Sequence, residues 1–156
     1  CSADQRVGED RMSVHELHFG AHAQAMEHVS LRAEWMRTGN VGMLAEHCQV
    51  PLAIYSDNSI GLIKQRHELH AMYESFCATV RDMGPVDLHQ EILHVSRNHQ
   101  SRVAIKVRRI WTPRFGTPLA ESIVYRMRVL PGTRGVLVEM IEILRDSADV
   151  RKEPAA

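Results

Sequence analysis

The sequence predicts an α+β domain, with helices in its first half and a sheet built mostly from its second half. Two Pro-free stretches, 14–38 and 65–83, carry hydrophobic residues at helical spacing. Four long stretches after residue 85 are rich in β-branched residues and alternate in part between apolar and polar positions. The connections between these four stretches are short enough for hairpins, which favours antiparallel pairing.

The first helix is predicted over residues 14–38. Six apolar side chains recur every three or four positions and form its expected buried stripe: Phe19, Ala23, Met26, Val29, Ala33 and Met36. Gly39 supplies a stop after this helix, and Asn40 can cap a short second helix. That second helix is expected to carry Val41, Met43, Leu44 and Cys48.

The middle of the chain predicts a small hairpin followed by a third helix. Residues 50–56 and 60–64 have strand character, and the turn residues 57–59 lie between them. The third helix covers about 65–83 and ends at Gly84, which Pro85 follows. Its apolar stripe consists of Leu69, Met72, Tyr73, Phe76, Val80 and Met83.

The second half predicts four antiparallel strands. They cover 86–95, 102–111, 119–130 and 136–144, and the turns between them fall at 98–100, 113–118 and 131–133. On the strand 102–111, the odd-numbered residues share one face, which is apolar apart from Arg109. The last strand has hydrophobic residues on both faces, so we expect one face to cover the helices and the other to pack on a second subunit.

Length and composition favour one globular domain. The 156 residues fit a single domain at 14–146, with polar tails expected at 1–13 and 147–156. Hydrophobic residues make up 44% and charged residues 24%, proportions that exclude a largely disordered chain. The 19 basic residues balance 19 acidic ones, so neither nucleic acid nor an anionic membrane surface is an expected partner.

The expected location follows from missing membrane and export signals. No apolar run reaches the roughly 20 residues that a membrane helix needs, and residues 1–12 lack a signal-peptide pattern. We therefore expect a cytoplasmic protein, with a processed lipoprotein beginning at Cys1 as the alternative. The three cysteines include no Cys-x-x-Cys pair, and no motif predicts a metal or another cofactor.

The order of elements and one local stretch resemble a known superfamily. A helix ending at Gly39-Asn40 is followed by the short helical segment 41–48, which leads into Val50-Pro51-Leu52-Ala53-Ile54-Tyr55. This layout resembles the nuclear transport factor 2-like superfamily, with its SnoaL-like and ketosteroid isomerase-like members, over about 14–146. The resemblance implies a cone in which a strongly bent, mixed or antiparallel sheet wraps three helices. It also implies a mostly apolar pocket and homodimers that pair through the sheet.

The resemblance leaves two functions open, because members of this superfamily differ in activity. One is a domain that binds a small apolar molecule and performs acid–base catalysis of the cyclase, dehydratase or isomerase type. The other is a non-catalytic subunit or oligomerisation module, similar to the small subunits of ring-hydroxylating dioxygenases. An enclosed pocket with converging polar groups would favour the enzyme, whereas a cone filled by its own side chains would favour the module.

Five residues are the candidates for a site. Tyr55 stands where isomerases of the superfamily carry their base, at the end of the first strand, and Glu139 is expected among apolar neighbours that include Ile141 and Ile143. We predict orienting and proton-transfer roles for Tyr55 and Glu139; the alternative for Glu139 is an ion pair with Arg126 or Arg128. Aromatic residues make up 5% of the chain, and the predicted ligand-binding walls are Trp35, Trp111 and Tyr125.

Other polar groups favour structural explanations. Asp57 is expected in a turn. His15, His18 and His22 share one helical face, where an exposed stripe is favoured over a metal clamp. On the strand 86–95, His89 and Glu91 are expected on one face and His94 on the other, and a solvated strand face is favoured over a dehydratase-like acid–histidine set.

Overall fold

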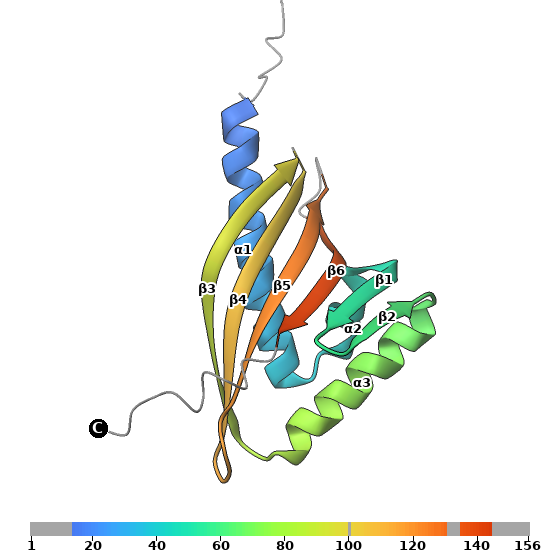
Figure 1. Ribbon diagram of the computed structural model, residues 1–156, viewed down its shortest axis with the longest axis vertical. Helices are drawn as coiled ribbons and strands as arrows, with labels where there is room; N and C mark the ends of the chain where they lie inside the picture. The colour runs from blue at the N-terminus through green and yellow to red at the C-terminus, as the bar shows by residue number, and fades with distance from the viewer. Residues whose placement is uncertain (1–13, 100, 131–134, 145–156) are drawn as a thin grey trace, which may run out of the picture.

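The computed structural model describes residues 14–99, 101–130 and 135–144, so the predicted tails at 1–13 and 147–156 lie outside the described residues. The described residues form three helices and six strands in the predicted order (Figure 1). None of these helices is both long and apolar enough to cross a lipid bilayer. The elements are α1 (Val14–Thr38), α2 (Val41–Glu46), β1 (Cys48–Ser56), β2 (Ser59–Ile63), α3 (Arg66–Asp82), β3 (Val86–His99), β4 (Arg102–Pro113), β5 (Leu119–Val129) and β6 (Val136–Leu144).

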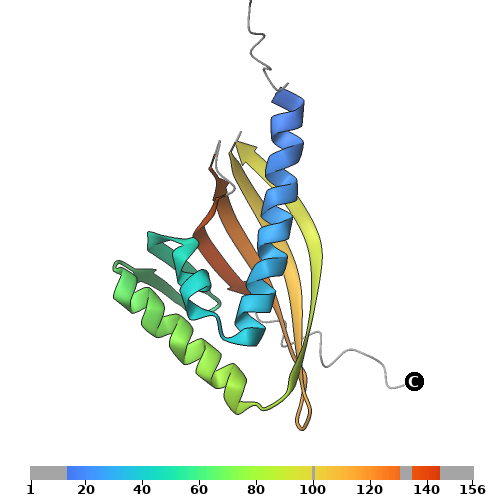
Figure 2. The same ribbon diagram turned by 180° about the vertical axis from the view of Figure 1, so that it is seen from behind.

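The six strands form one mixed, unclosed sheet in the order β2-β1-β6-β5-β4-β3. Strands β1 and β6 run parallel, and every other neighbouring pair is antiparallel. The sheet is strongly bent, and all three helices lie on its concave side (Figures 1 and 2). The predicted α+β class with a bent sheet around three helices is therefore confirmed.

The hydrophobic core lies between the helices and the concave side of the sheet, which we call the inner face. On β4, the odd-numbered residues from Val103 to Trp111 are buried there, as predicted from period-two alternation. Helix α3 contributes Leu69, Tyr73, Cys77 and Val80. Helix α1 crosses this face and accepts a 3.2 Å hydrogen bond from Gln90 Nε2 of β3 at the Val29 carbonyl. The convex side is called the outer face below.

The predicted helix ends are close to those of the structure. Gly39 has a φ of 75°, a left-handed conformation that glycine adopts without strain. Asn40 caps α2 by accepting a 3.2 Å hydrogen bond from the Met43 amide. Cys48, expected in α2, instead begins β1, because α2 ends at Glu46 and Cys48 pairs with Val138 of β6.

Two of the predicted turns fall partly or wholly outside the described residues. Strand β3 continues through His99, so only Gln100 of the turn expected at 98–100 is left, and it lies outside the described residues. The turn expected at 131–133 also lies outside them.

The buried face of α1 differs from the predicted apolar stripe. Met26 is 38% exposed and Ala23 is also exposed, whereas the charged residue Arg32 is 1% exposed. The buried stripe is Ala21, Ala25, His28, Val29, Arg32 and Met36. His28 and Arg32 are polar, so a stripe predicted from apolar residues alone lies on a different side of α1 from the face that is buried.

Two of the register shifts in the sheet, one in β6 and one in β3, change the predicted face assignments. In β6, a register shift at Glu139 places Ile141 opposite Tyr125 on the inner face, whereas Glu139 lies on the outer face. The expectation that Glu139 and Ile141 share a face is therefore wrong. In β3, a shift between Ile92 and His94 places His94 opposite Lys106.

The shift in β3 corrects the predicted division of its polar residues. His89, Glu91 and His94 pair with Ile110, Arg108 and Lys106, which are all outer-face residues of β4. The three side chains are exposed, so the favoured interpretation, a solvated strand face, matches their placement.

Candidate ligand-binding cleft

The inner face holds a buried ion pair that uses two of the predicted wall residues. Arg109 is 4% exposed, and its Nη2 and Nε donate to Glu121 Oε1 over 2.8 Å and 3.2 Å. Trp111 Nε1 donates to the same oxygen over 3.1 Å, and Arg109 Nη1 donates to the Tyr125 hydroxyl over 3.1 Å. Trp111 and Tyr125 are thus brought together by the structure, but as partners of an internal ion pair.

A second buried guanidinium, that of Arg32, lies nearby. Its Nη2 donates to the Tyr73 hydroxyl over 2.5 Å and lies 3.7 Å from Cys48 Sγ, and its Nη1 donates to the Leu44 carbonyl over 3.4 Å. The guanidinium also lies 5.5 Å from the ring centre of Tyr125. Burial raises the pKa of Tyr73, so this phenol stays protonated. Large side chains of the protein itself therefore occupy the inner face.

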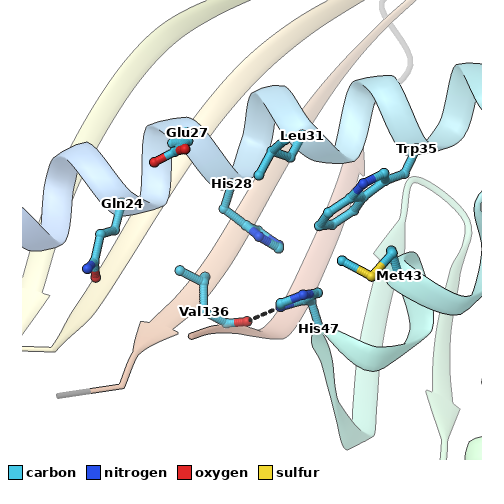
Figure 3. A pocket seen from close by; sticks show the side chains of 8 residues that line it. All are labelled: Gln24, Glu27, His28, Leu31, Trp35, Met43, His47 and Val136. Atoms are coloured by element: carbon cyan, nitrogen blue, oxygen red, sulfur yellow. Dashed lines mark hydrogen bonds between the residues drawn. The ribbon is translucent and has the colours of Figure 1, made fainter. Parts of the chain in front are cut away.

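A separate cleft opens beside this core, between α1, α2 and the start of β6 (Figure 3). Its volume is about 350 Å³. Glu27 and Leu31 at its edge are exposed, whereas His28 is 4% exposed, so the cleft leads from solvent to the core. The eight lining residues are Gln24, Glu27, His28, Leu31, Trp35, Met43, His47 and Val136.

Local structure explains how these residues meet. The five that come from α1 lie at positions i, i+3, i+4, i+7 and i+11 relative to Gln24, and so share one helix face. His47 is the single residue between α2 and β1, and its backbone carbonyl accepts a 2.8 Å hydrogen bond from the Val138 amide. The His47 side chain is held as well, because its Nδ1 lies 3.1 Å from the Val136 carbonyl oxygen.

The hydrogen bond from His47 determines its tautomer. A carbonyl oxygen can only accept, so Nδ1 carries a proton, and in the uncharged form of the ring the lone pair lies on Nε2. The indole of Trp35 stacks on this imidazole, with ring centres 5.3 Å apart and an interplanar angle of 18°. The ring of His28 lies 5.0 Å from that of His47 and 5.6 Å from that of Trp35.

His28 is a neutral imidazole with an unsatisfied nitrogen. Burial, together with the positive charge of Arg32 and that of His47 in its protonated form, lowers the pKa of His28 to about 3, so the ring is uncharged at neutral pH. Its buried Nε2 has no hydrogen-bond partner among the described residues. Such a group costs free energy unless a ligand or a water molecule supplies the missing partner.

The cleft offers two imidazoles and no metal-binding set. Nowhere in the described parts of the chain do three or more His, Cys, Asp or Glu side chains gather so that they could hold a metal ion. Of the histidine stripe at 15–22, the side chains of His15 and His18 lie outside the described residues, and His22 Nε2 accepts a 3.4 Å hydrogen bond from Arg97. The chemistry available in the cleft is hydrogen bonding and proton transfer through imidazole nitrogens.

Of the five predicted site residues, Trp35 alone lines this cleft. Tyr55 is 37% exposed and lies in β1 opposite Ile60 of β2. Glu139 lies on the outer face, where its carboxylate is 3.4 Å from Arg102 and 3.3 Å from Arg128. The ion pair expected between Glu139 and Arg128 is therefore confirmed. The orienting and proton-transfer roles of Tyr55 and Glu139 stay predictions.

Sequence reasoning did not single out His28 or His47. The available signal for His28 was its spacing from Arg32 and Trp35, four and seven positions later, which places three polar or amphipathic side chains on one helix face. No comparable signal exists for His47, because its partner Val136 lies 89 positions away in the chain.

The described residues have the fold of nuclear transport factor 2-like proteins, an α+β fold also called cystatin-like. No family model matches the sequence, and no curated protein matches it. The resemblance inferred from element order is confirmed by solved structures, at the level of fold.

Three solved structures illustrate this likeness. A ketosteroid isomerase-like protein from Erwinia carotovora atroseptica SCRI1043 has a TM-score of 0.59 at 13% identity, over 85% of this chain and 98% of that one. A domain of unknown function with a cystatin-like fold from Nostoc punctiforme PCC 73102 has a TM-score of 0.62 at 15% identity, over 80% and 77%. A protein described as a dehydratase of the NTF2-like family from Streptomyces avermitilis has a TM-score of 0.62 at 12% identity, over 80% and 94%.

Proposed function

We propose that this chain binds a small, mostly apolar molecule in the cleft between α1, α2 and β6, and that His47 accepts a proton from it. The observation that carries the proposal is the buried, unpartnered Nε2 of His28 beside the His47 ring in a cleft of about 350 Å³. A ligand with a hydrogen-bonding group would satisfy this nitrogen. The names of two fold neighbours, ketosteroid isomerase-like and dehydratase, are compatible with acid–base chemistry.

The surroundings of His47 suit a proton acceptor. Its Nδ1–H donates to the Val136 carbonyl, which directs the lone pair of Nε2 away from that bond. When Nε2 takes up a proton, the bond to the carbonyl is kept and becomes charge-assisted, which stabilises the imidazolium. Trp35 fixes the plane of the ring by stacking. His28, with its lowered pKa, stays neutral and acts as a hydrogen-bonding group.

The proposal is tested by screening small cyclic compounds for binding by native mass spectrometry and thermal shift. We expect at least one compound that stabilises the wild-type protein and loses most of its affinity in His47→Gln and Trp35→Leu. The matched control is His70→Gln, a histidine on the exposed side of α3, which should bind as the wild type does. A ligand whose affinity is equal in all four proteins would show that the cleft is not the site.

A second candidate function, a non-catalytic assembly module, is favoured by one specific observation. The inner face is occupied by the protein's own side chains, including the buried Arg32, Arg109, Tyr125 and Trp111. A homodimer through the sheet is part of this proposal, and the outer side of β2 offers Ile60 at 75% and Leu62 at 54% exposure. Native mass spectrometry of the wild type and of Ile60→Asp/Leu62→Asp tests it, because a dimer that uses this surface would dissociate in the variant.

A further inference from the structure

The charges around the cleft are uneven. Among its eight lining residues, Glu27 is the only carboxylate, and none is a lysine or an arginine. Glu27 forms no ion pair with any described residue, in contrast to Glu34 two turns later, which pairs with Arg37 over 2.6 Å. Glu27 therefore gives the cleft a negative charge that no described residue neutralises in an ion pair.

The interior of the cleft offers no lysine or arginine to an anion. Because Nδ1 of His47 donates to the Val136 carbonyl, the lone pair of its uncharged form lies on Nε2, where it attracts hydrogen-bond donors and repels a carboxylate. His28 is neutral, so neither its ring nor Glu27 offers the positive charge that a buried anion requires.

The buried charge of Arg32 decides where along the cleft a cation can lie. Arg32 follows His28 by one helical turn and is hydrogen-bonded inside the core, so it does not line the cleft. Its charge disfavours a second cation close to His28 and Trp35. Glu27 lies on the side of His28 away from Trp35 and Met43 (Figure 3), which leaves that end for a positive group.

From this arrangement we infer that the cleft takes organic amines: an apolar ring lies against Trp35, Leu31 and Met43, and an ammonium group on a short tether lies beside Glu27. This inference rests on the proposed function, because it names the ligand class of the same cleft. Neutral compounds of the same shape bind more weakly, and carboxylates bind most weakly. Because Glu27 is exposed, the modest strength of exposed ion pairs applies, which corresponds to a preference of roughly tenfold for the amine over the carboxylate at low salt.

The test uses three probes that share one ring: tryptamine, 3-methylindole and indole-3-acetate. Their dissociation constants are measured by calorimetry at low ionic strength, for the wild type and for Glu27→Gln. We expect tryptamine to bind roughly tenfold more tightly than indole-3-acetate, and the ratio to fall towards one in Glu27→Gln. Glu74→Gln, at an exposed glutamate of α3, is the matched control and keeps the wild-type ratio.

The possible failures of the two proposals differ. Equal binding of all three probes, lost in His47→Gln and Trp35→Leu, would overturn the amine preference and leave the cleft as a binding site. Binding that neither of these two substitutions changes would place the probes elsewhere and overturn both proposals. If none of the probes binds at millimolar concentration, the assignment of an indole-sized amine is wrong. The compound screen then decides whether the cleft binds another molecule.

Discussion

The two faces of the sheet carry ion pairs of nearly equal length in very different surroundings. On the inner face, Arg109 and Glu121 are 2.8 Å apart, and their side chains are 5% and 13% exposed. On the outer face, Arg126 and Glu142 are 3.0 Å apart, and their side chains are 44% and 30% exposed. Water stabilises each separated outer charge but has far less access to the inner ones, so burial, and not distance, decides what the loss of a partner costs.

The largest expected effect is that of Glu121→Gln on the inner face. It leaves the Arg109 guanidinium buried without its carboxylate, so we expect the free energy of unfolding to fall by about 3–5 kcal/mol. Urea denaturation measures the change.

A double variant serves as its control. In Arg109→Met/Glu121→Leu neither charge is present, and most of the lost stability should return. A double variant as unstable as Glu121→Gln would mean that the pair matters through its hydrogen bonds to Trp111 and Tyr125, and not through its charge.

Next in size, for a change of one pH unit, is the pH dependence caused by His28. Its folded pKa of about 3 lies below the ordinary 6.5, so the unfolded chain binds more protons between these values. Stability should therefore fall as the pH drops from about 6.5 towards 3, by up to about 1.4 kcal/mol per pH unit from this residue.

Denaturation of the wild type and of His28→Gln across this pH range isolates the effect, because glutamine does not titrate. The difference in free energy between the two proteins should change steadily with pH. Parallel curves would show that the His28 ring is hydrated in solution, and that desolvation does not extend from the inner face to the cleft.

The smallest expected effect is that of Glu139→Gln on the outer face. Its two partners, Arg102 and Arg128, are 54% and 37% exposed and become hydrated when the carboxylate is removed. We expect a loss below about 1 kcal/mol, which shrinks further at high salt. A loss as large as that of Glu121→Gln would contradict the contrast between the faces and would indicate that a second subunit covers the outer one. A loss of turnover at unchanged stability would instead support the predicted proton-transfer role.

Local sequence patterns were sufficient to predict the helices and strands, because capping and periodicity act within a few residues. The helix at 14–38 and the last strand at 136–144 have the predicted bounds, and the odd-numbered face of β4 is buried as period-two alternation requires. Face assignments failed where a bulge added one residue, as at Glu139, since a bulge depends on the partner strand and leaves no local signal.

Of the residues that line the cleft, Trp35 was predicted from the sequence as a ligand-binding residue, and the others were not. A stripe predicted from the hydrophobic residues of α1 omits His28 and Arg32, because the burial of these polar residues depends on contacts with distant parts of the core. His47 acquires its tautomer and position from β6, far away in the sequence.

The sequence by itself determined the order of helices and strands, the α+β class and the fold that these share with nuclear transport factor 2-like proteins. It did so because backbone propensity and side-chain periodicity are local properties. Only the tertiary structure decided which polar groups are buried and which groups they pair with, because desolvation and pairing depend on contacts between distant segments. For this reason the ion pairs, the neutral His28 and the cleft beside it follow from the folded chain.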